Sequence, residues 1–265
     1  MTACPLISIE RVTLQHGGNP IVREASLQIS EGEVVALIGA SGSGKSLLSR
    51  TPLNLLPPGI KREKGEILYR NRSLLTLSDQ EIRTIRGREI AMILQSPFAS
   101  LDPTMKIGHQ IGEGYHHHHP SLTRKEVKKE VFSWLERVGI LPPKESYNLY
   151  PHEMSGGMQQ RIAIAMALIN RPSLLIADEI TTALDASTQQ DILYLLQSIQ
   201  AEEGMAVLFI THNLSLVRQW ADRIAVMYQG EIIETASPDA LFTSPQNAYS
   251  QHLIDALPPP IEAAL

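Results

Sequence analysis

Short apolar runs and amphipathic stretches alternate along most of the chain. Before residue 96, β-like runs occupy residues 6–14, 21–29, 33–38, 66–69 and 89–94. After residue 158 we expect a helix over residues 161–169, a strand over 174–177, a helix with Ile192, Leu195, Leu196 and Ile199 on one face, and a strand over 207–210. A hairpin over residues 224–235 turns at Gln229-Gly230. Strands that alternate with helices predict an α/β fold with a parallel sheet.

The middle of the chain has a different pattern. Strand signals are missing from residue 97 to about residue 151, and apolar residues there share one helical face: Val127, Val131, Trp134, Leu135 and Val138. We therefore predict an all-helical insertion into the α/β core. Another helix is expected to begin after residue 44 and to run to about residue 56. Pro52 lies inside it and predicts a bend or an early end.

A glycine-rich loop with the sequence GASGSGKS joins the apolar run at residues 34–38 to that helix. Its spacing fits a phosphate-binding P-loop, in which glycines let backbone N–H groups face an anion at a helix N-terminus. We expect the nucleotide to be held by Gly39, Ala40, Ser41, Gly42, Ser43, Gly44, Lys45, Ser46 and Leu47. Lys45 would reach the terminal phosphates, and the Ser46 hydroxyl would bind Mg²⁺. A flexible Gly/Ser turn would explain the glycines but not the Lys-Ser pair.

A second candidate element is LLIADE at residues 174–179. Asp178 follows four apolar residues, which places it at the carboxyl end of a buried parallel strand, where ligands of such sheets bind. Asp178 is the expected Mg²⁺-organising carboxylate, and Glu179 is positioned to orient or deprotonate a water that attacks the γ-phosphate. A surface Asp-Glu pair at a strand end is the simpler alternative, and the P-loop upstream argues against it.

The segment MSGGMQQR at residues 154–161 provides another anion cradle. Ser155 would cap an apolar helix, and Gly156 and Gly157 would expose backbone N–H groups. One nucleotide does not need two cradles. We therefore expect this cradle to hold the γ-phosphate of a nucleotide on another subunit, so that the active site forms between two cassettes.

These motifs resemble, in order, those of the nucleotide-binding subunits of ATP-binding cassette (ABC) transporters, and the resemblance covers nearly the whole chain. GASGSGKS corresponds to the Walker A loop of that family, MSGGMQQR to its signature and LLIADE to its Walker B segment. The tripeptide ALD at residues 183–185 corresponds to the D-loop, with Asp185 expected near the nucleotide. Gln95 matches the Q-loop glutamine and His212 the switch histidine. The resemblance implies that Gln95 contacts Mg²⁺ or the attacking water, and that His212 touches the γ-phosphate.

The resemblance also implies an architecture and partners. It implies a P-loop (RecA-like) core with an N-terminal antiparallel β subdomain: residues 1–96 hold that subdomain and the first part of the core, 97–157 the helical subdomain with the signature, 158–245 the rest of the core, and 246–265 a short tail. ATP and Mg²⁺ are the expected cofactors. The expected partners are a second, homologous ATPase subunit, two integral-membrane permease subunits and an extracytoplasmic solute-binding protein.

Two further stretches narrow the family. ILQSPFASLDPTMKIGHQI at residues 93–111 is similar to the corresponding segment in the ATPases of peptide and nickel importers, and SGGMQQRIAIAMAL at residues 155–168, followed by LLIADE, is similar to the D-type subunit of that group. The end of the chain, SPQNAYSQHLIDALP at residues 244–258, resembles the tail of the same group, although Ala248 stands where Pro is usual before the Tyr. Many peptide-importer relatives carry a C-terminal cysteine cluster, and Cys4 is the only cysteine here. This difference favours the nickel or metal-chelate branch.

Composition narrows the remaining choices. A net charge of −5 and a pI near 6.0 provide no electrostatic footprint for nucleic acid. The longest apolar run, residues 162–169, is too short to span a bilayer, and we expect no signal peptide, so the chain is expected on the cytoplasmic face of the bacterial cell membrane as a peripheral subunit. His116, His117, His118 and His119 suggest metal binding, but we expect a solvated loop there, because four adjacent residues cannot all point at one ion.

Three other functions remain to be weighed. A soluble ABC ATPase that acts on ribosomes or DNA usually carries paired cassettes or a long coiled-coil insertion, together with basic segments, and the sequence shows none of these. A GTPase switch would need an Asn-Lys-x-Asp motif, which is absent from the sequence. A non-hydrolysing interaction subunit is disfavoured by Glu179.

Overall fold

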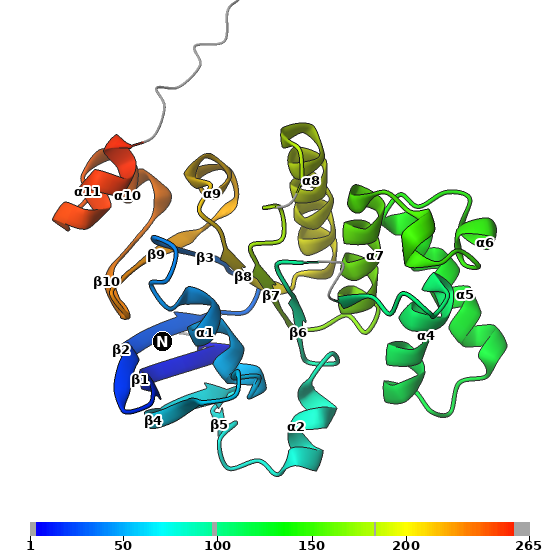
Figure 1. Ribbon diagram of the computed structural model, residues 1–265, viewed down its shortest axis with the longest axis horizontal. Helices are drawn as coiled ribbons and strands as arrows, with labels where there is room; N and C mark the ends of the chain where they lie inside the picture. The colour runs from blue at the N-terminus through cyan, green and yellow to red at the C-terminus, as the bar shows by residue number, and fades with distance from the viewer. Residues whose placement is uncertain (1–3, 97–99, 183, 257–265) are drawn as a thin grey trace, which may run out of the picture.

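A computed structural model describes residues 4–96, 100–182 and 184–256 of the protein. A four-stranded antiparallel sheet has the order β2-β1-β4-β5 and consists of β1 (Ile7–His16), β2 (Asn19–Ile29), β4 (Ile60–Tyr69) and β5 (Arg72–Ser73). A six-stranded sheet has the order β10-β9-β3-β8-β7-β6. The two sheets lie against each other with α1 (Lys45–Arg50) between them and the nucleotide-loop region at their junction (Figure 1).

The six-stranded sheet is the parallel core that the alternating pattern predicted. It consists of β3 (Val34–Ile38), β6 (Ile90–Ile93), β7 (Leu174–Asp178), β8 (Ala206–Ile210), β9 (Arg223–Tyr228) and β10 (Glu231–Ala236), of which only β10 runs antiparallel to its neighbour. Every residue of β3, β7 and β8 is buried. Continuous apolar runs give this result because a parallel sheet is covered on both faces.

The helix after the P-loop ends early. It stops at Arg50, and a 3₁₀ turn (Thr51–Leu53) follows with Pro52 in its first two positions. The early end expected from Pro52 is confirmed. The expected extension to residue 56 is wrong, because proline lacks the N–H that an α-helix needs. The helix α2 (Asp79–Ile85) begins at a capping box in which Ser78 and Glu81 satisfy each other's backbone N–H groups.

Residues 100–168 are largely helical, as the pattern of the middle segment predicted. They form α4 (Ile107–His118), α5 (Arg124–Arg137), α6 (Pro143–Ser146), a 3₁₀ turn (Pro151–Glu153) and α7 (Gly156–Leu168). The expected start of the helical segment, at residue 97, lies outside the described residues. The prediction of a loop at His116–His119 is wrong, because the first three of these histidines form the last turn of α4 and only His119 lies beyond it.

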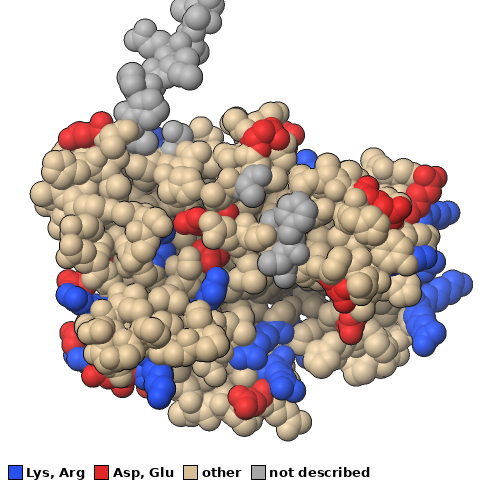
Figure 2. Space-filling model, in the orientation of Figure 1, with Lys and Arg blue, Asp and Glu red and all other residues tan. Residues whose placement is uncertain are grey.

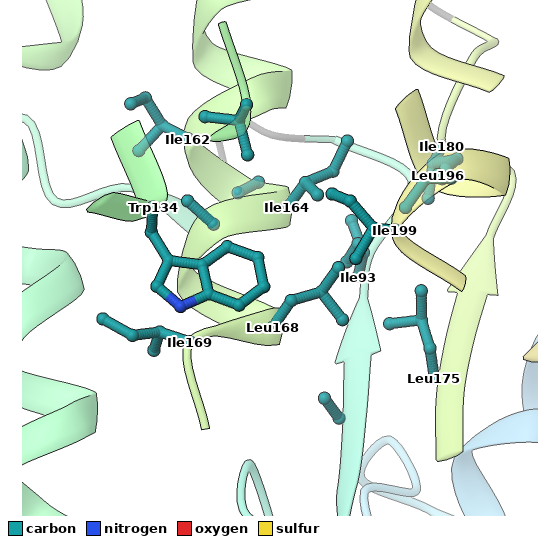
Figure 3. Packing of buried hydrophobic residues seen from close by; sticks show 14 of the residues in the cluster. Ile93, Trp134, Ile162, Ile164, Leu168, Ile169, Leu175, Ile180, Leu196 and Ile199 are labelled. Atoms are coloured by element: carbon teal, nitrogen blue, oxygen red, sulfur yellow. The ribbon is translucent and has the colours of Figure 1, made fainter. Parts of the chain in front are cut away.

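Trp134 fixes the helical segment to the sheet. Its side chain is fully buried and lies among Ile162, Leu168 and Ile169 of the α7 region (Figure 3). The same apolar cluster continues to Ile93 on β6 and Leu175 on β7, and to Leu196 and Ile199 on α8 (Ala186–Glu203). A shared core of this kind holds the start of α7 at a fixed position relative to the strand ends.

The C-terminal part adds short helices beside the sheet. They are α9 (Leu214–Trp220), which the pattern did not predict, α10 (Pro238–Thr243) and α11 (Ala248–Asp255). Tyr249 and Leu253 of α11 pack against a small apolar cluster that includes Ile38, Val226 and Leu241. The tail beyond residue 256 lies outside the described residues.

Candidate nucleotide-binding site

The strand order brings the sequence motifs to one edge of the parallel sheet. β3, β8, β7 and β6 are neighbours in that order, and all four run in the same direction. The P-loop follows β3, His212 follows β8, Asp178 ends β7, and Gln95 follows β6. The carboxyl ends of parallel strands are where ligands bind in such sheets, so the strand order assembles the site.

The P-loop backbone is tightly enclosed by the β9–β10 hairpin. Gly39 has a φ of 148°, and a Cβ atom there would lie 2.1 Å from the carbonyl oxygen of Met227. The N–H of Gly230 donates to the carbonyl oxygen of Ser43 at 3.1 Å. Gly44, with a φ of 103°, precedes the first residue of α1. These contacts leave room only for glycine at residue 39 and hold the loop in a curved conformation at a helix N-terminus.

Lys45 lies inside the curve of the loop. Its Nζ donates to the carbonyl oxygens of Gly39 at 2.8 Å and Ala40 at 2.9 Å. Lys45 is only 4% exposed, and burial lowers the pKa of its ammonium group, while the charges of Glu179 and Asp178 act in the opposite direction. The cation is therefore anchored to the loop that a phosphate would occupy.

Ser46 and Asp178 meet across the site. The Ser46 hydroxyl donates to Asp178 Oδ1 at 2.8 Å, and Arg50 Nη2 lies 3.8 Å from Asp178 Oδ2. Asp178 is 1% exposed, and burial raises the pKa of its carboxyl group, whereas Ser46 and Arg50 oppose that shift. The two residues that the sequence suggested as Mg²⁺ ligands are thus in direct contact.

Glu179 and Gln95 form a second pair beside the first. Gln95 Nε2 donates to Glu179 Oε2 at 2.9 Å. Glu179 has a φ of 49°, and its N–H donates to the carbonyl oxygen of Ile210 at 3.0 Å. A non-glycine residue at positive φ costs about 1–3 kcal/mol, and such strain is concentrated at functional sites. This backbone bend turns the Glu179 side chain towards Gln95 at the edge of the sheet.

A cavity of about 320 Å³ contains most of these groups. The described residues that line it are Ile21, Ser41, Gly42, Gly44, Lys45, Ser46, Leu47, Gln95 and Glu179. Ile21 on β2 was not among the predicted site residues, because a lone strand isoleucine is normally a core residue. Arg50 was also missed, although its position one turn beyond Ser46 on α1 could have suggested it.

The other predicted residues lie elsewhere. Ser155 caps α7 by accepting the Met158 N–H at 3.3 Å, and a Cβ atom at Gly157 would lie 2.9 Å from Thr188 Cγ2. Asp185 caps α8, and the hydrogen bond from the Thr188 N–H holds the pKa of its carboxyl below the usual range. His212 is exposed after β8. None of residues 155–157, 185 and 212 is among the described residues that line the cavity, and Ala183 of the D-loop tripeptide lies outside the described residues.

The donor set suits Mg²⁺ better than a transition metal. Ser46 provides a hydroxyl oxygen and Asp178 a carboxylate, and Mg²⁺ is commonly bound through one or two carboxylates together with substrate phosphates. Within the described residues, no group of three or more His, Cys, Asp or Glu side chains could hold a metal ion, and this includes the histidines at 116–119. No helix in the same part of the chain is long and apolar enough to cross a membrane.

The fold and this edge of the sheet define a P-loop ATP-binding cassette. A family profile described as "ABC transporter" matches residues 22–182. Among solved structures, cbiO1 from Clostridium perfringens, part of the ABC transporter complex cbiONQ, is similar with a TM-score of 0.79 at 27% identity, over 91% of this chain and 92% of that one. The ATP-binding cassette MJ0796, in a dimeric post-hydrolysis state bound to ADP and Pi, is similar with a TM-score of 0.77 at 28% identity, over 88% and 98%. This chain belongs to the ABC transporter family.

Several curated relatives are ATP-binding proteins named for peptide or peptidoglycan transport. The dipeptide transport ATP-binding protein DppD of Bacillus subtilis is 46% identical over 89% of this chain and 71% of its own length. The oligopeptide transport ATP-binding protein OppD of the same organism is 44% identical over 89% and 66%. The peptidoglycan transport ATP-binding protein YejF of Agrobacterium fabrum is 46% identical over 96% of this chain, which spans about half (47%) of that relative.

Proposed function

We propose that this chain is the ATP-binding and ATP-hydrolysing subunit of a bacterial importer. The observation that carries the proposal is the adjacency of two pairs at the sheet edge, Ser46 with Asp178 and Gln95 with Glu179, beside the buried Lys45. They match the parts that a P-loop ATPase needs: a cation for the phosphates, oxygen ligands for a metal, and a carboxylate that orients water. The names of the relatives favour this function over a soluble ABC ATPase that acts on ribosomes or DNA.

Each residue has a defined task in the proposed hydrolysis. The backbone N–H groups of the P-loop and Lys45 bind the phosphates, and Ser46, Asp178 and the Gln95 carbonyl oxygen would hold Mg²⁺. When bound, Mg²⁺ neutralises charge that develops on the phosphate oxygens. Glu179 accepts a proton from, or orients, the attacking water, and Gln95 holds the Glu179 carboxylate in place at 2.9 Å. His212 contributes to γ-phosphate contact once the complete site is assembled.

The complete site is proposed to form between two cassettes. Ser155, Gly156 and Gly157 begin α7 outside the cavity that contains Lys45, so a nucleotide in that cavity lies away from its own signature segment. A partner cassette, a second homologous ATPase subunit, would supply the signature residues and Asp185. The dimeric state described for MJ0796 supports this arrangement.

The permease subunits are proposed to dock at an apolar groove near Gln95. This groove has a volume of about 280 Å³ and is lined in part by Leu53, Leu55, Met92, Ala163 and Met166. Figure 2 shows the surface hollowed between the α2 region and the helices α4 and α5, with Lys and Arg side chains beside the hollow. Since β6 lines the groove and leads directly to Gln95, a docked permease loop would sense the nucleotide site. The subunit would thus lie on the cytoplasmic face of the membrane.

The proposed cargo is a short peptide or a peptide-like molecule delivered by a solute-binding protein. DppD and OppD are named for dipeptide and oligopeptide transport, which supports this choice. The sequence favoured the nickel or metal-chelate branch, so the experiment below also includes a nickel chelate as a candidate cargo. ATP turnover by the complex purified through this chain should rise with a peptide-loaded binding protein; stimulation by a nickel chelate alone would assign the metal branch.

Glu179→Gln in the same complex tests the catalytic assignment. ATPase activity should fall at least about 100-fold, as expected for the loss of a general base. Glu113→Gln, an exposed glutamate on α4, is the matched control and should retain full activity. Half-retained activity in Glu179→Gln would mean that the partner's composite site also fires, and unchanged activity would reject the assignment.

A further inference from the structure

Tyr249 touches the P-loop from the far end of the chain. It lies in the first turn of α11, and its hydroxyl accepts the N–H of Ala40 at 2.9 Å across a separation of 209 residues. The Tyr249 side chain is half-buried and packs on the apolar cluster that contains Ile38, the last residue of β3. The C-terminal helix is therefore connected to the start of the phosphate-binding loop.

This hydrogen bond acts on the same peptide group that Lys45 uses. The carbonyl oxygen of Gly39 and the N–H of Ala40 belong to one peptide unit; Lys45 Nζ donates to its oxygen at 2.8 Å, and Tyr249 accepts from its nitrogen at 2.9 Å. A planar peptide held at both ends cannot rotate. Hydrogen bonding at the N–H also polarises the carbonyl group, which strengthens the contact with Lys45.

Neighbouring contacts fix the Tyr249 ring itself. The ring lies against that of Tyr228 at the end of β9, with centroids 4.1 Å apart and planes tilted by 30°. The N–H of Tyr249 donates to Asn247 Oδ1 at 2.9 Å. Glu234 on β10 accepts the N–H groups of Gln246 and Asn247 at 2.8 and 3.1 Å, which sets the point where α11 begins. The hydroxyl thus reaches Ala40 from a side chain with little freedom.

We propose that Tyr249 is a positioning residue for nucleotide binding: its hydroxyl holds the Gly39–Ala40 peptide so that Lys45 and the loop are pre-arranged for the phosphates of ATP, and it couples the placement of α11 to nucleotide affinity. This inference rests on the proposed function, since it concerns the same site. It adds a residue outside the family motifs and links the C-terminal helix to the phosphate-binding loop.

Tyr249→Phe tests the proposal, because it removes the hydroxyl and keeps the ring on Tyr228. The matched control is Tyr228→Phe, which retains the ring pair and loses a hydroxyl that accepts a hydrogen bond from Gln229 Nε2 at 3.0 Å. We measure the Kd of a fluorescent ATP analogue for the full chain, and KM and kcat for ATP in the complex purified through it. Tyr249→Phe should weaken binding and raise KM by roughly two- to tenfold with kcat unchanged, as expected for one hydrogen bond that contributes to ground-state and transition-state binding alike. Tyr228→Phe should match the parent.

Several outcomes would overturn the proposal. Equal Kd and KM values for Tyr249→Phe and the parent would show that the Ala40 contact does not position the loop. A fall in kcat with an unchanged KM, or the same loss in Tyr228→Phe, would assign the effect to general packing of the two tyrosines. If the parent chain itself bound no ATP analogue with Mg²⁺, the proposed function would fail, and this result is distinct from the failure of Tyr249→Phe alone.

Discussion

Gly39 offers a sharp test of how the P-loop is held. Gly39→Ala places a methyl group where the backbone has a φ of 148° and where Cβ would lie 2.1 Å from the Met227 carbonyl oxygen. An ordinary contact would need more than another ångström, and the obstructing atom belongs to the backbone of β9, which is buried in the sheet. Either the loop or the strand must therefore move.

The magnitude follows from two contributions. A strained backbone conformation for a non-glycine residue costs about 1–3 kcal/mol, and overpacking of a close-packed site costs about 1–3 kcal/mol more. We expect Gly39→Ala to lower the free energy of unfolding by about 2–6 kcal/mol, a large part of the roughly 5–15 kcal/mol typical of a native protein. The displaced loop should also lose affinity for ATP, because its N–H groups no longer converge on the phosphates.

Urea unfolding followed by circular dichroism measures the first effect, and titration with a fluorescent ATP analogue measures the second. Gly18→Ala is the matched control: Gly18 has a φ of 85° in the β1–β2 turn, and nothing lies within 4 Å of a Cβ atom there. It should cost only the conformational strain, about 1–2 kcal/mol, and leave ATP affinity unchanged. If Gly39→Ala were no more destabilising than Gly18→Ala, the clash with Met227 would not constrain the loop.

Four further predictions concern charge, packing and the partner site. Because burial raises the pKa of Asp178, its carboxylate opposes folding once the pH exceeds the raised pKa. Asp178→Asn should therefore unfold at a higher urea concentration than the parent at pH 7, and this difference in stability should disappear as the pH falls towards 3.8 and below. The same variant should lose Mg²⁺-dependent ATPase activity. Asp185→Asn should behave oppositely, because the Thr188 hydrogen bonds lower the pKa of Asp185. The parent should be more stable than Asp185→Asn above pH 3.8 and should lose that difference as the pH falls through the lowered pKa. If the free energies of unfolding of the two variants, each relative to the parent, changed with pH in the same direction, both assignments would be refuted. Trp134→Ala should lower the free energy of unfolding by about 3–5 kcal/mol in urea titrations, whereas Trp134→Phe should cost distinctly less, and equal losses would contradict the packing described for the fully buried indole. Ser155→Ala should reduce ATPase turnover of the assembled complex but leave ATP binding by the single chain unchanged, and a loss of single-chain binding would contradict a signature segment that acts on the partner's nucleotide.

The sequence by itself determined the class of fold and the motifs on which the proposed chemistry rests. Strands read from apolar runs at residues 33–38, 174–177 and 207–210 are present as β3, β7 and β8. The P-loop and the strand-end carboxylates were identified because their information is local: turn-forming glycines, a cap and an apolar run lie within about ten residues of one another. Local steric preferences and hydrophobic periodicity act over that range, so they can be recognised without knowing the tertiary structure.

Local signals failed at the end of α4, where packing decided the conformation. The segment lies in the predicted helical insertion, but a loop was expected at its histidines, and the first three of them instead extend a helix whose Ile107 and Ile111 are buried in the core against α5 and α7. Gly108 and Gly112 favour no helix by propensity, but they let the helix approach its neighbours closely: a Cβ atom at Gly108 would collide with the Tyr147 ring. Tertiary contact here overrides propensity.

Only the tertiary structure decided which side chains meet. The contacts of Ser46 with Asp178, Gln95 with Glu179 and Ala40 with Tyr249 span 132, 84 and 209 residues. They depend on the strand order β3-β8-β7-β6 and on the position of α11 beside β9. No periodic pattern of apolar residues in the sequence indicates either of these placements. A sequence encodes the elements through interactions between near neighbours, whereas the relative placement of distant elements follows from the packing of the whole core.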